Sequence, residues 1–392
     1  MISVGIDVSK KKSTVCIMDH TGKTLRAPFD IRHTVDDLDK LVSLVESYNT
    51  EARVVLEATG HYHLPVTNYL VKSDIYVSCI NALQMKMFSS QNLRRAKTDN
   101  IDSRKIAEYG TKNWYDLKPY YQEEEKYGEL RMLSRQYDKK TELIVTEKVN
   151  LTNILDMVMP GIKLILSDEK LLEFAEKYIH YENIIKMGEK KFSAHYCKWA
   201  NKKGYRMNER KASEIYASAQ NGIPVLPNTP STKIVVREAI HMIFSIEKSR
   251  NTILTQMKEL CNTIPEYEIV KDMPSVGEIT GAKLIAEVGD IHRFHSKHAL
   301  IAYAGIDVPP YDSGEFSANN RKITKRGNSY LRKIGYQIIL SVIRNKSDKS
   351  PVYEYYTKKR NEGKPAKKAM IAALNKLLRI YYGKVSELYS IS

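Results

Sequence analysis

The chain begins with the stretch Ile2-Ser3-Val4-Gly5-Ile6-Asp7-Val8, and this run decides the fold of its first part. Its β-branched residues favour a strand. A basic turn, Lys10-Lys11-Lys12, and a second short β-branched run, Ser13–Met18, follow directly. Farther along, signals for helices and strands alternate at Thr34–Tyr48 (helix), Arg53–Leu56 (strand), His63–Lys72 (helix), Ile75–Cys79 (strand) and Thr98–Tyr109 (helix). This alternation predicts a layered α/β domain with helices packed on a sheet.

After about Glu123 the pattern changes to one that is typical of long helices. In a first segment apolar residues recur every seven positions, at Leu130, Tyr137, Ile144, Leu151 and Val158. In a second segment they follow steps of four and three, at Ala239, Ile243, Ile246, Arg250, Ile253, Met257, Leu260 and Ile264, with Arg250 as the polar exception. Such stripes can pair within one chain as a helical hairpin or between two copies as a coiled coil, and both interpretations stay open.

The last part of the chain starts near Pro265 and is expected to be mainly α-helical. Pro274-Ser275-Val276-Gly277, followed by a helix to Val288, resembles half of a helix-hairpin-helix element, in which backbone N–H groups bind a phosphate. For Gly277 a turn that merely packs the core is equally open. The predicted fold class is therefore α/β plus α, with domains at 1–118 (α/β), 119–264 (long helices) and 265–392 (mainly helical).

The net charge indicates a polyanionic partner. Lys and Arg number 62 against 46 Asp and Glu, a balance of +16. Residues 291–392 hold 20 of these basic residues and 7 of the acidic ones, which leaves +13 in that block. Nucleic acid is the usual partner of such a block. A membrane surface is excluded as the partner because neither a signal peptide nor an apolar span is visible. The four cysteines lie far apart, which is typical of a cytoplasmic protein.

Four acidic residues are candidates for a metal site. Asp7 and Glu57 lie in or at the end of predicted strands, and an acid among apolar strand residues needs a cation nearby. Asp99 and Asp102 are three residues apart, so a helix places both on one face. Four carboxylates suit Mg²⁺, which can activate a phosphodiester displacement. For Asp99 and Asp102 alone, ordinary first-turn helix acids would be the simpler interpretation.

A second candidate site is Ser313, in the segment Asp312-Ser313-Gly314 of the basic block. By itself this triplet is typical of a turn. Two prolines precede it, however, and basic residues follow it that could neutralise a phosphate: Arg321, Lys322, Lys325, Arg326 and Arg332. A serine that attacks phosphorus forms a phosphoserine, which conserves the bond energy for rejoining the strand.

These motifs carry a resemblance to a known family. Gly5-Ile6-Asp7, Glu57-Ala58-Thr59-Gly60, Asn81-Ala82 and Lys97-Thr98-Asp99-Asn100-Ile101-Asp102 resemble the RuvC-like DEDD domain of the insertion-sequence-110 transposases. The C-terminal block resembles the second domain of that family over Tyr303–Gly314 and Ile323–Arg332. One departure is Arg321-Lys322, where members often carry glycine.

The resemblance implies a fold and a mechanism. The first domain would be RuvC/RNase H-like, the four carboxylates would hold Mg²⁺, and Ser313 would be the nucleophile. The family exchanges DNA strands under the guidance of a structured bridge RNA. Its dimers join into a tetramer in which the serine of one subunit meets the carboxylates of another. The expected partners are therefore DNA, a structured guide RNA and further copies of the chain.

Two other functions stay open. A plain RuvC-like metal nuclease or junction resolvase needs only the carboxylates, and a non-catalytic nucleic-acid-binding protein needs neither site. Tyr355-Tyr356 beside Lys358-Lys359-Arg360 is a candidate nucleic-acid surface, although an amphipathic surface helix has the same pattern. His292, His295 and His298 are interpreted as surface histidines rather than zinc ligands.

Overall fold

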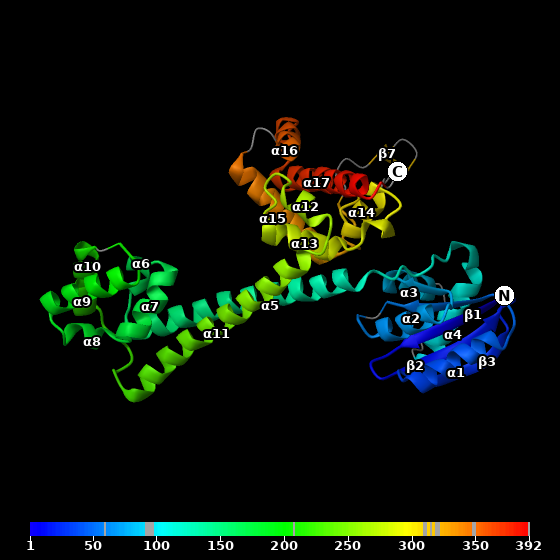
Figure 1. The fold of residues 1–392 in the computed structure, drawn as a ribbon, viewed down its shortest axis with the longest axis horizontal. Helices are drawn as coiled ribbons and strands as arrows, with labels where there is room; N and C mark the ends of the chain where they lie inside the picture. Colours follow the sequence, from blue (N-terminus) through cyan, green and yellow to red (C-terminus); the bar gives the residue numbers. More distant parts are fainter. Residues whose placement is uncertain are drawn as a thin grey trace. The chain divides into compact units, whose positions relative to one another are not determined.

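The computed structural model describes residues 1–58, 60–90, 98–206, 208–308, 312–313, 316–317, 322–346 and 350–390. The chain divides into two compact units, Met1–Glu123 and Glu124–Ser392 (Figure 1). The first unit is a sheet covered by helices, and the second consists almost entirely of helices. The predicted α/β fold of the first part and the helical character of the rest are confirmed at this level. The division into three domains stays a prediction.

The sheet of the first unit is mixed and has the strand order β3-β2-β1-β4-β5. Its strands are β1 (Ile2–Val8), β2 (Lys12–Asp19), β3 (Thr24–Arg32), β4 (Ala52–Glu57) and β5 (Val77–Ile80). β1, β2 and β3 form antiparallel pairs, whereas β4 and β5 run parallel to β1. The central strand β1 therefore has a partner on each side, and its carboxyl end lies beside the carboxyl end of β4.

Helices cover both faces of this sheet. They are α1 (Val35–Glu46), α2 (His63–Lys72), α3 (Ala82–Ser89) and α4 (Asp99–Lys112). One face presents Val4, Ile6 and their neighbours to the core that α1 and α2 complete. The other face presents the alternate residues, among them Gly5, to α4. Side chains alternate along a strand, so the position of an acidic residue in its strand decides whether it lies on the face of α1 and α2 or on the face of α4.

Two elements of the first unit lie outside the sequence-based prediction. β3 is an edge strand with mostly exposed side chains and a proline, Pro28. An edge strand tolerates proline because one side of it needs no ladder hydrogen bonds, but neither feature predicts a strand. The short helix α3 begins with an N-cap, in which the Asn81 side chain accepts a hydrogen bond from the Leu83 N–H at 2.8 Å. The predicted Thr34 cap of α1 is confirmed.

The second unit contains two long helices, α5 (Glu125–Val158) and α11 (Pro230–Cys261), which pack against each other (Figure 1). An ion pair of 3.5 Å joins Lys148 of α5 to Glu247 of α11. Of the two interpretations of the apolar stripes, the structure shows the pairing within one chain.

A small helical module connects the two long helices. It consists of α6 (Ile162–Ile165), α7 (Asp168–Tyr178), α8 (Tyr181–Ile185), α9 (Glu189–Lys202) and α10 (Glu209–Asn221). The buried aromatic residues Phe174, Tyr178, Phe192, Tyr196 and Trp199 dominate its core. The predicted loop between Asn221 and Pro230 lies between α10 and α11.

The remaining helices share one core with the start of α5 and the end of α11. They are α12 (Tyr267–Lys271), α13 (Glu278–Val288), α14 (Lys297–Ala304), α15 (Ser329–Asn345), α16 (Pro351–Asn361) and α17 (Ala366–Leu388). The two-residue strands β6 (Asp312–Ser313) and β7 (Phe316–Ser317) pair antiparallel. Within the described part of the chain, no helix combines the length and the apolar character that a membrane span requires.

Candidate active site

Asp7 and Glu57 lie side by side at the carboxyl ends of two neighbouring strands, β1 and β4. β1 and β4 are parallel, and their last paired residues are Ile6 and Leu56, so each strand continues with its acidic residue. Ile6 and Leu56 are buried in the core under α1 and α2. Because side chains alternate, Asp7 and Glu57 belong to the opposite face, which α4 covers. Both residues are half-buried.

Helix α4 brings the other two carboxylates to the same end of the sheet. A Cβ atom on Gly5 would overlap backbone atoms of Ser103 and Ala107, so α4 lies directly on β1. One helical turn further on, Gly110 lies against Ser3, which shows that α4 runs opposite to β1. The start of α4, with Asp99 and Asp102, therefore lies at the end of β1 that carries Asp7. The structure brings the four predicted residues to one end and one face of the sheet.

Lysine side chains accompany two of these carboxylates. The Lys12 Nζ lies 4.0 Å from Asp99 Oδ2 and 2.7 Å from Asp30 Oδ2, and the Lys105 Nζ lies 3.8 Å from Asp102 Oδ1. The hydrogen bond to Asp30 raises the pKa of Lys12, so this ammonium stays charged. Asp30 comes from the unpredicted strand β3, and this explains why the sequence did not place it near the site.

The four carboxylates fit an oxygen-preferring cation in their chemistry. The described residues contain no ready-made group of three or more His, Cys, Asp or Glu side chains close enough to hold a metal ion. The four carboxylates nevertheless lie at one end of the sheet, and hard cations such as Mg²⁺ prefer carboxylate oxygens. A cation there would balance the negative charge of Asp99 and Asp102, which Lys12 and Lys105 now balance in part.

Cys79 is close to Glu57 but is not a second nucleophile. Burial, with a contribution from the Glu57 charge, raises the pKa of the thiol to about 11. A thiol with this pKa remains protonated at neutral pH and is unreactive.

The second half of the predicted site lies around β6. The structure places Ser313 in this strand, whose backbone pairs Ser313 with Phe316. Arg321, and the two prolines and the glycine that flank the serine segment, lie outside the described residues.

The basic segment 322–328 is fixed to the segment 303–307, which leads toward β6. The Lys325 N–H donates to the Gly305 carbonyl at 3.0 Å, and the Asn328 N–H donates to the Tyr303 carbonyl at 2.6 Å. A Cβ atom on Gly327 would overlap the same Tyr303 carbonyl oxygen. This close approach requires glycine at 327. It holds the basic segment against residues 303–307, which precede Ser313 in the sequence.

The predicted nucleic-acid-binding residues fall into two groups. Lys322, Lys325 and Arg326 are exposed and available to a phosphate. Arg332 is half-buried, and its Nη1 donates to the carbonyls of Ala304 at 2.9 Å and of Gly327 at 3.0 Å. Its guanidinium therefore holds the protein backbone.

Gly277, the fourth position of the predicted phosphate-binding turn, is the N-cap of α13. The Gly277 N–H donates to the Thr280 hydroxyl at 2.9 Å, so a side chain of the same helix already satisfies this donor. His292, His295 and His298 are all exposed, as predicted for surface histidines.

Sequence reasoning did not find an ionic network behind the basic segment. Glu287 of α13 contacts both Arg135 of α5 and Asn328, the N-cap of α15. Arg135 and Glu287 are 152 residues apart in the chain, and no local motif signals such a pair.

Comparison with known proteins identifies the family. A family model described as a transposase matches residues 4–160, and a model of the transposase IS116/IS110/IS902 family matches residues 267–356. The chain belongs to the IS116/IS110/IS902 family of transposases. One match covers the four carboxylates and the other covers the segment around Ser313, and so the resemblance that the sequence motifs carry is confirmed.

The chain is also similar to individual proteins. An insertion element IS116 protein of 44.8 kDa from Streptomyces clavuligerus is 24% identical over 373 residues, which are 92% of this chain and 89% of that protein. The transposase of element IS1111A from Coxiella burnetii is 29% identical over 137 residues, 31% of this chain and 37% of that protein. Among solved structures, T. thermophilus RuvC in complex with a Holliday junction covers 31% of this chain and 99% of its own, with 10% identity and a TM-score of 0.24.

Proposed function

We propose that this protein is an enzyme that cleaves and exchanges DNA strands at the ends of an insertion sequence and at its target. The observation that carries this proposal is the gathering of Asp7, Glu57, Asp99 and Asp102 at one end and one face of the sheet. Membership in a transposase family supports the choice of DNA as the substrate.

In this proposal the four carboxylates of the RuvC-like unit hold Mg²⁺. The bound cation would supply charge neutralisation at the phosphodiester and would activate the attacking oxygen. The protein positions the donors: β1 and β4 fix Asp7 beside Glu57, and the close packing of α4 on Gly5 fixes Asp99 and Asp102. Lys12 lies 4.0 Å from Asp99 and Lys105 lies 3.8 Å from Asp102, so both lysines place positive charge beside these carboxylates.

The nucleophile in the proposal is Ser313. Its hydroxyl oxygen bonds to phosphorus, the phosphorus–oxygen bond to one DNA fragment breaks, and the hydroxyl proton passes through solvent to the released DNA oxygen. The reverse reaction with a different DNA hydroxyl rejoins the strand and regenerates the serine, so no ATP is needed. Lys322, Lys325 and Arg326 would stabilise the additional negative charge on the phosphate in the transition state.

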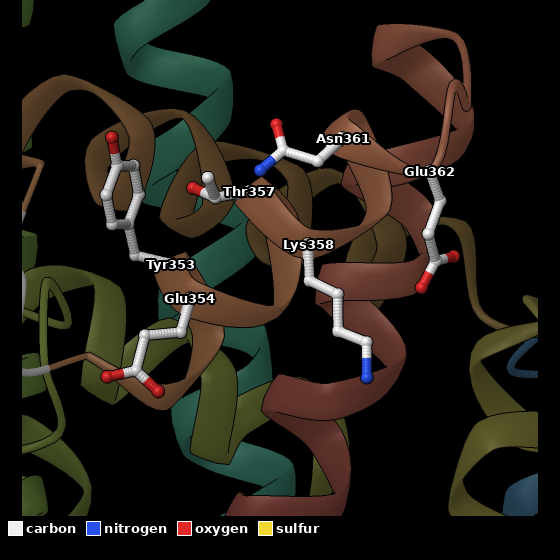
Figure 2. A pocket seen from close by; sticks show the side chains of 6 residues that line it. All are labelled: Tyr353, Glu354, Thr357, Lys358, Asn361 and Glu362. Carbon is white, nitrogen blue, oxygen red and sulfur yellow. The ribbon is translucent and has the colours of Figure 1, made fainter.

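A surface for nucleic acid is proposed at the turn between α16 and α17, here called the basic corner. It consists of Lys358, Lys359, Arg360, Lys364, Lys367 and Lys368. Lys359 is paired with Glu362 at 2.8 Å, whereas Lys358, Lys364 and Lys367 are exposed. A hollow of about 640 Å³ lies along the adjoining face of α16 and is lined by Tyr353, Glu354, Thr357, Lys358, Asn361 and Glu362 (Figure 2). Since its lining mixes two acids with one lysine, the phosphate contacts belong to the corner rather than to the hollow.

Guidance by a structured RNA and assembly of dimers into a tetramer complete the proposal. The charge of +13 in residues 291–392 supports contacts with more than one nucleic acid. In a tetramer the serine of one copy can act beside the carboxylates of another.

Two variants test the proposed reaction on DNA that spans the element's own ends, supplied with RNA transcribed from the element's non-coding segment. We expect wild-type protein with Mg²⁺ to cut and join strands, and Ser313→Ala and Asp102→Asn each to abolish both steps. Cleavage that survives in Ser313→Ala would indicate a metal nuclease or junction resolvase. Binding without any reaction of the wild type would indicate a non-catalytic nucleic-acid-binding protein.

A further inference from the structure

We propose that Glu287 is a positioning residue, which together with Arg135 holds Asn328 and thereby sets the geometry of the basic segment 322–328. This inference rests on the proposed function, because it assigns to a buried ionic network the task of fixing the side chains that contact the scissile phosphate. None of the three residues is expected to touch DNA.

The first step of the argument is the burial of the carboxylate. Glu287 of α13 is 1% exposed. The Arg135 guanidinium reaches it from α5 with both arms, Nε to Oε1 at 2.9 Å and Nη2 to Oε2 at 3.0 Å. This two-point contact raises the pKa of Arg135 and fixes the plane of the carboxylate. The buried charge thus has a defined orientation.

The second step is the connection to the basic segment. The Asn328 Nδ2 donates to Glu287 Oε2 at 2.8 Å, so the amide nitrogen faces α13. The Asn328 Oδ1 then accepts hydrogen bonds from the Tyr330 and Leu331 N–H groups at 2.9 and 3.1 Å and caps α15. The Glu287 carboxylate is the shortest contact of this Nδ2, and together with the Tyr303 hydroxyl at 3.2 Å it fixes the direction of the cap and the end of the segment that carries Lys325 and Arg326.

The third step is the conformation of the segment itself. Lys325 has a φ of +55°, a region that residues with a Cβ atom rarely adopt. Such a conformation persists where the surroundings determine it, and it is frequent at functional sites. Here the hydrogen bonds of the Lys325 and Asn328 N–H groups surround it on both sides. The Asn328 side chain anchors the residue whose N–H makes the second of these bonds, so its release from Glu287 loosens that restraint.

The fourth step shows that the Glu287 network is not needed merely to hold α5, α13 and α15 together. A second ionic group already ties α5 to α13 and α15, since Lys283 pairs with Asp138, and Lys333 lies 3.4 Å from Asp138. A buried ion pair is often no more stabilising than an apolar pair of similar volume. The distinguishing feature of the Glu287 network is its contact with Asn328.

The first test measures the segment directly, by hydrogen–deuterium exchange of the full-length protein. In Glu287→Gln one carboxylate oxygen becomes an NH₂ group, which must face a donor of Arg135 or of Asn328. We expect exchange at the Lys325 and Asn328 amides to rise about tenfold, while the core amides of α13 and α15 keep their protection. The matched control is Glu142→Gln, which removes the partner of Lys333 at 3.0 Å and leaves Asn328 untouched. Unchanged exchange at 325 and 328, or a general rise across α13, would overturn the proposal.

The second test uses the reaction of the element-end DNA. We expect Glu287→Gln to lower the rate of covalent protein–DNA adduct formation about 10- to 100-fold while DNA affinity stays within about twofold, because a misplaced group impairs reaction geometry. Equal losses of rate in Glu142→Gln, or a loss of affinity that accounts for the whole effect, would overturn the positioning role. If the wild type forms no adduct, the proposed function fails, and the exchange measurement alone decides whether Glu287 holds the segment.

Discussion

At the scale of single residues, Gly5 determines how closely helix α4 approaches the strand that carries Asp7. It lies in the middle of β1, where the backbone of α4 comes so close that no side chain fits. The proximity of Asp99 and Asp102 to Asp7 follows from this contact. A glycine within a strand often marks such a close approach of another backbone.

We therefore expect Gly5→Ala to damage fold and site together. The added methyl group must displace α4, and overpacking of this kind costs about 1–3 kcal/mol. Thermal unfolding would show the lower stability, and strand cleavage would fall more than the unfolded fraction explains. Gly128→Ala is the control, since Gly128 is exposed within α5 and no atom lies near the position of its Cβ. There alanine should be neutral or stabilising by up to about 1 kcal/mol.

At the scale of helices, α5 connects distant parts of the second unit. Its first turns carry Tyr127, which packs in the core of the C-terminal helices, and its last turns pack in the core of the α6–α10 module. The Tyr127 hydroxyl donates to Glu266 Oε1 at 2.9 Å, and the Tyr389 hydroxyl donates to Oε2 of the same fully buried carboxylate at 2.6 Å. Burial, with the Glu266 charge second, raises the pKa of Tyr127, which keeps its hydroxyl protonated as a donor.

Removal of this donor should destabilise the second unit. In Tyr127→Phe one oxygen of a buried carboxylate loses its partner, which costs about 1–3 kcal/mol. Denaturant unfolding measures the change, and a lower midpoint at an unchanged slope is the expected result. Tyr115→Phe provides the comparison. Tyr115 is 88% exposed, so the loss of its hydroxyl leaves no buried group without a partner. A Tyr127→Phe protein as stable as Tyr115→Phe would contradict this account of Glu266.

The sequence was informative about elements whose pattern is local. The runs at Ile2–Val8 and His63–Lys72 have the bounds that the structure shows, because apolar periodicity acts over a few positions. β3 was not predicted, since an exposed edge strand with Pro28 shows no clear alternation. Motifs indicated the four carboxylates, whereas the pairing of Arg135 with Glu287 depends on how distant helices pack and leaves no local signal.

At the scale of the whole molecule, the two halves of the proposed site belong to different compact units with different charge. The carboxylates belong to the unit that ends at Glu123, and the serine and most of the excess positive charge belong to the other. This separation supports a division of labour in which a metal ion neutralises charge at the carboxylates and basic side chains do so near the serine.

The basic corner should contribute to nucleic-acid affinity through salt-dependent contacts. We expect replacement of Lys358, Lys364, Lys367 and Lys368 by alanine to weaken binding to DNA and to reduce the slope of log K against log salt by about 0.7–0.9 for each lost phosphate contact. Replacement of the exposed Lys190, Lys191, Lys198 and Lys202 of the α6–α10 module removes the same charge and serves as the control. Equal slopes for both variants would show that only net charge matters.

The most direct measurement of the central claim is the identification of the residue that bonds to DNA. Wild-type protein reacts with element-end DNA, the element's RNA and Mg²⁺, the mixture is denatured and digested, and mass spectrometry locates the nucleotide-linked peptide. We predict a phosphodiester link at Ser313, which disappears without Mg²⁺ and in Asp102→Asn. Joined DNA products without any such link, or a link at a different residue, would contradict the account.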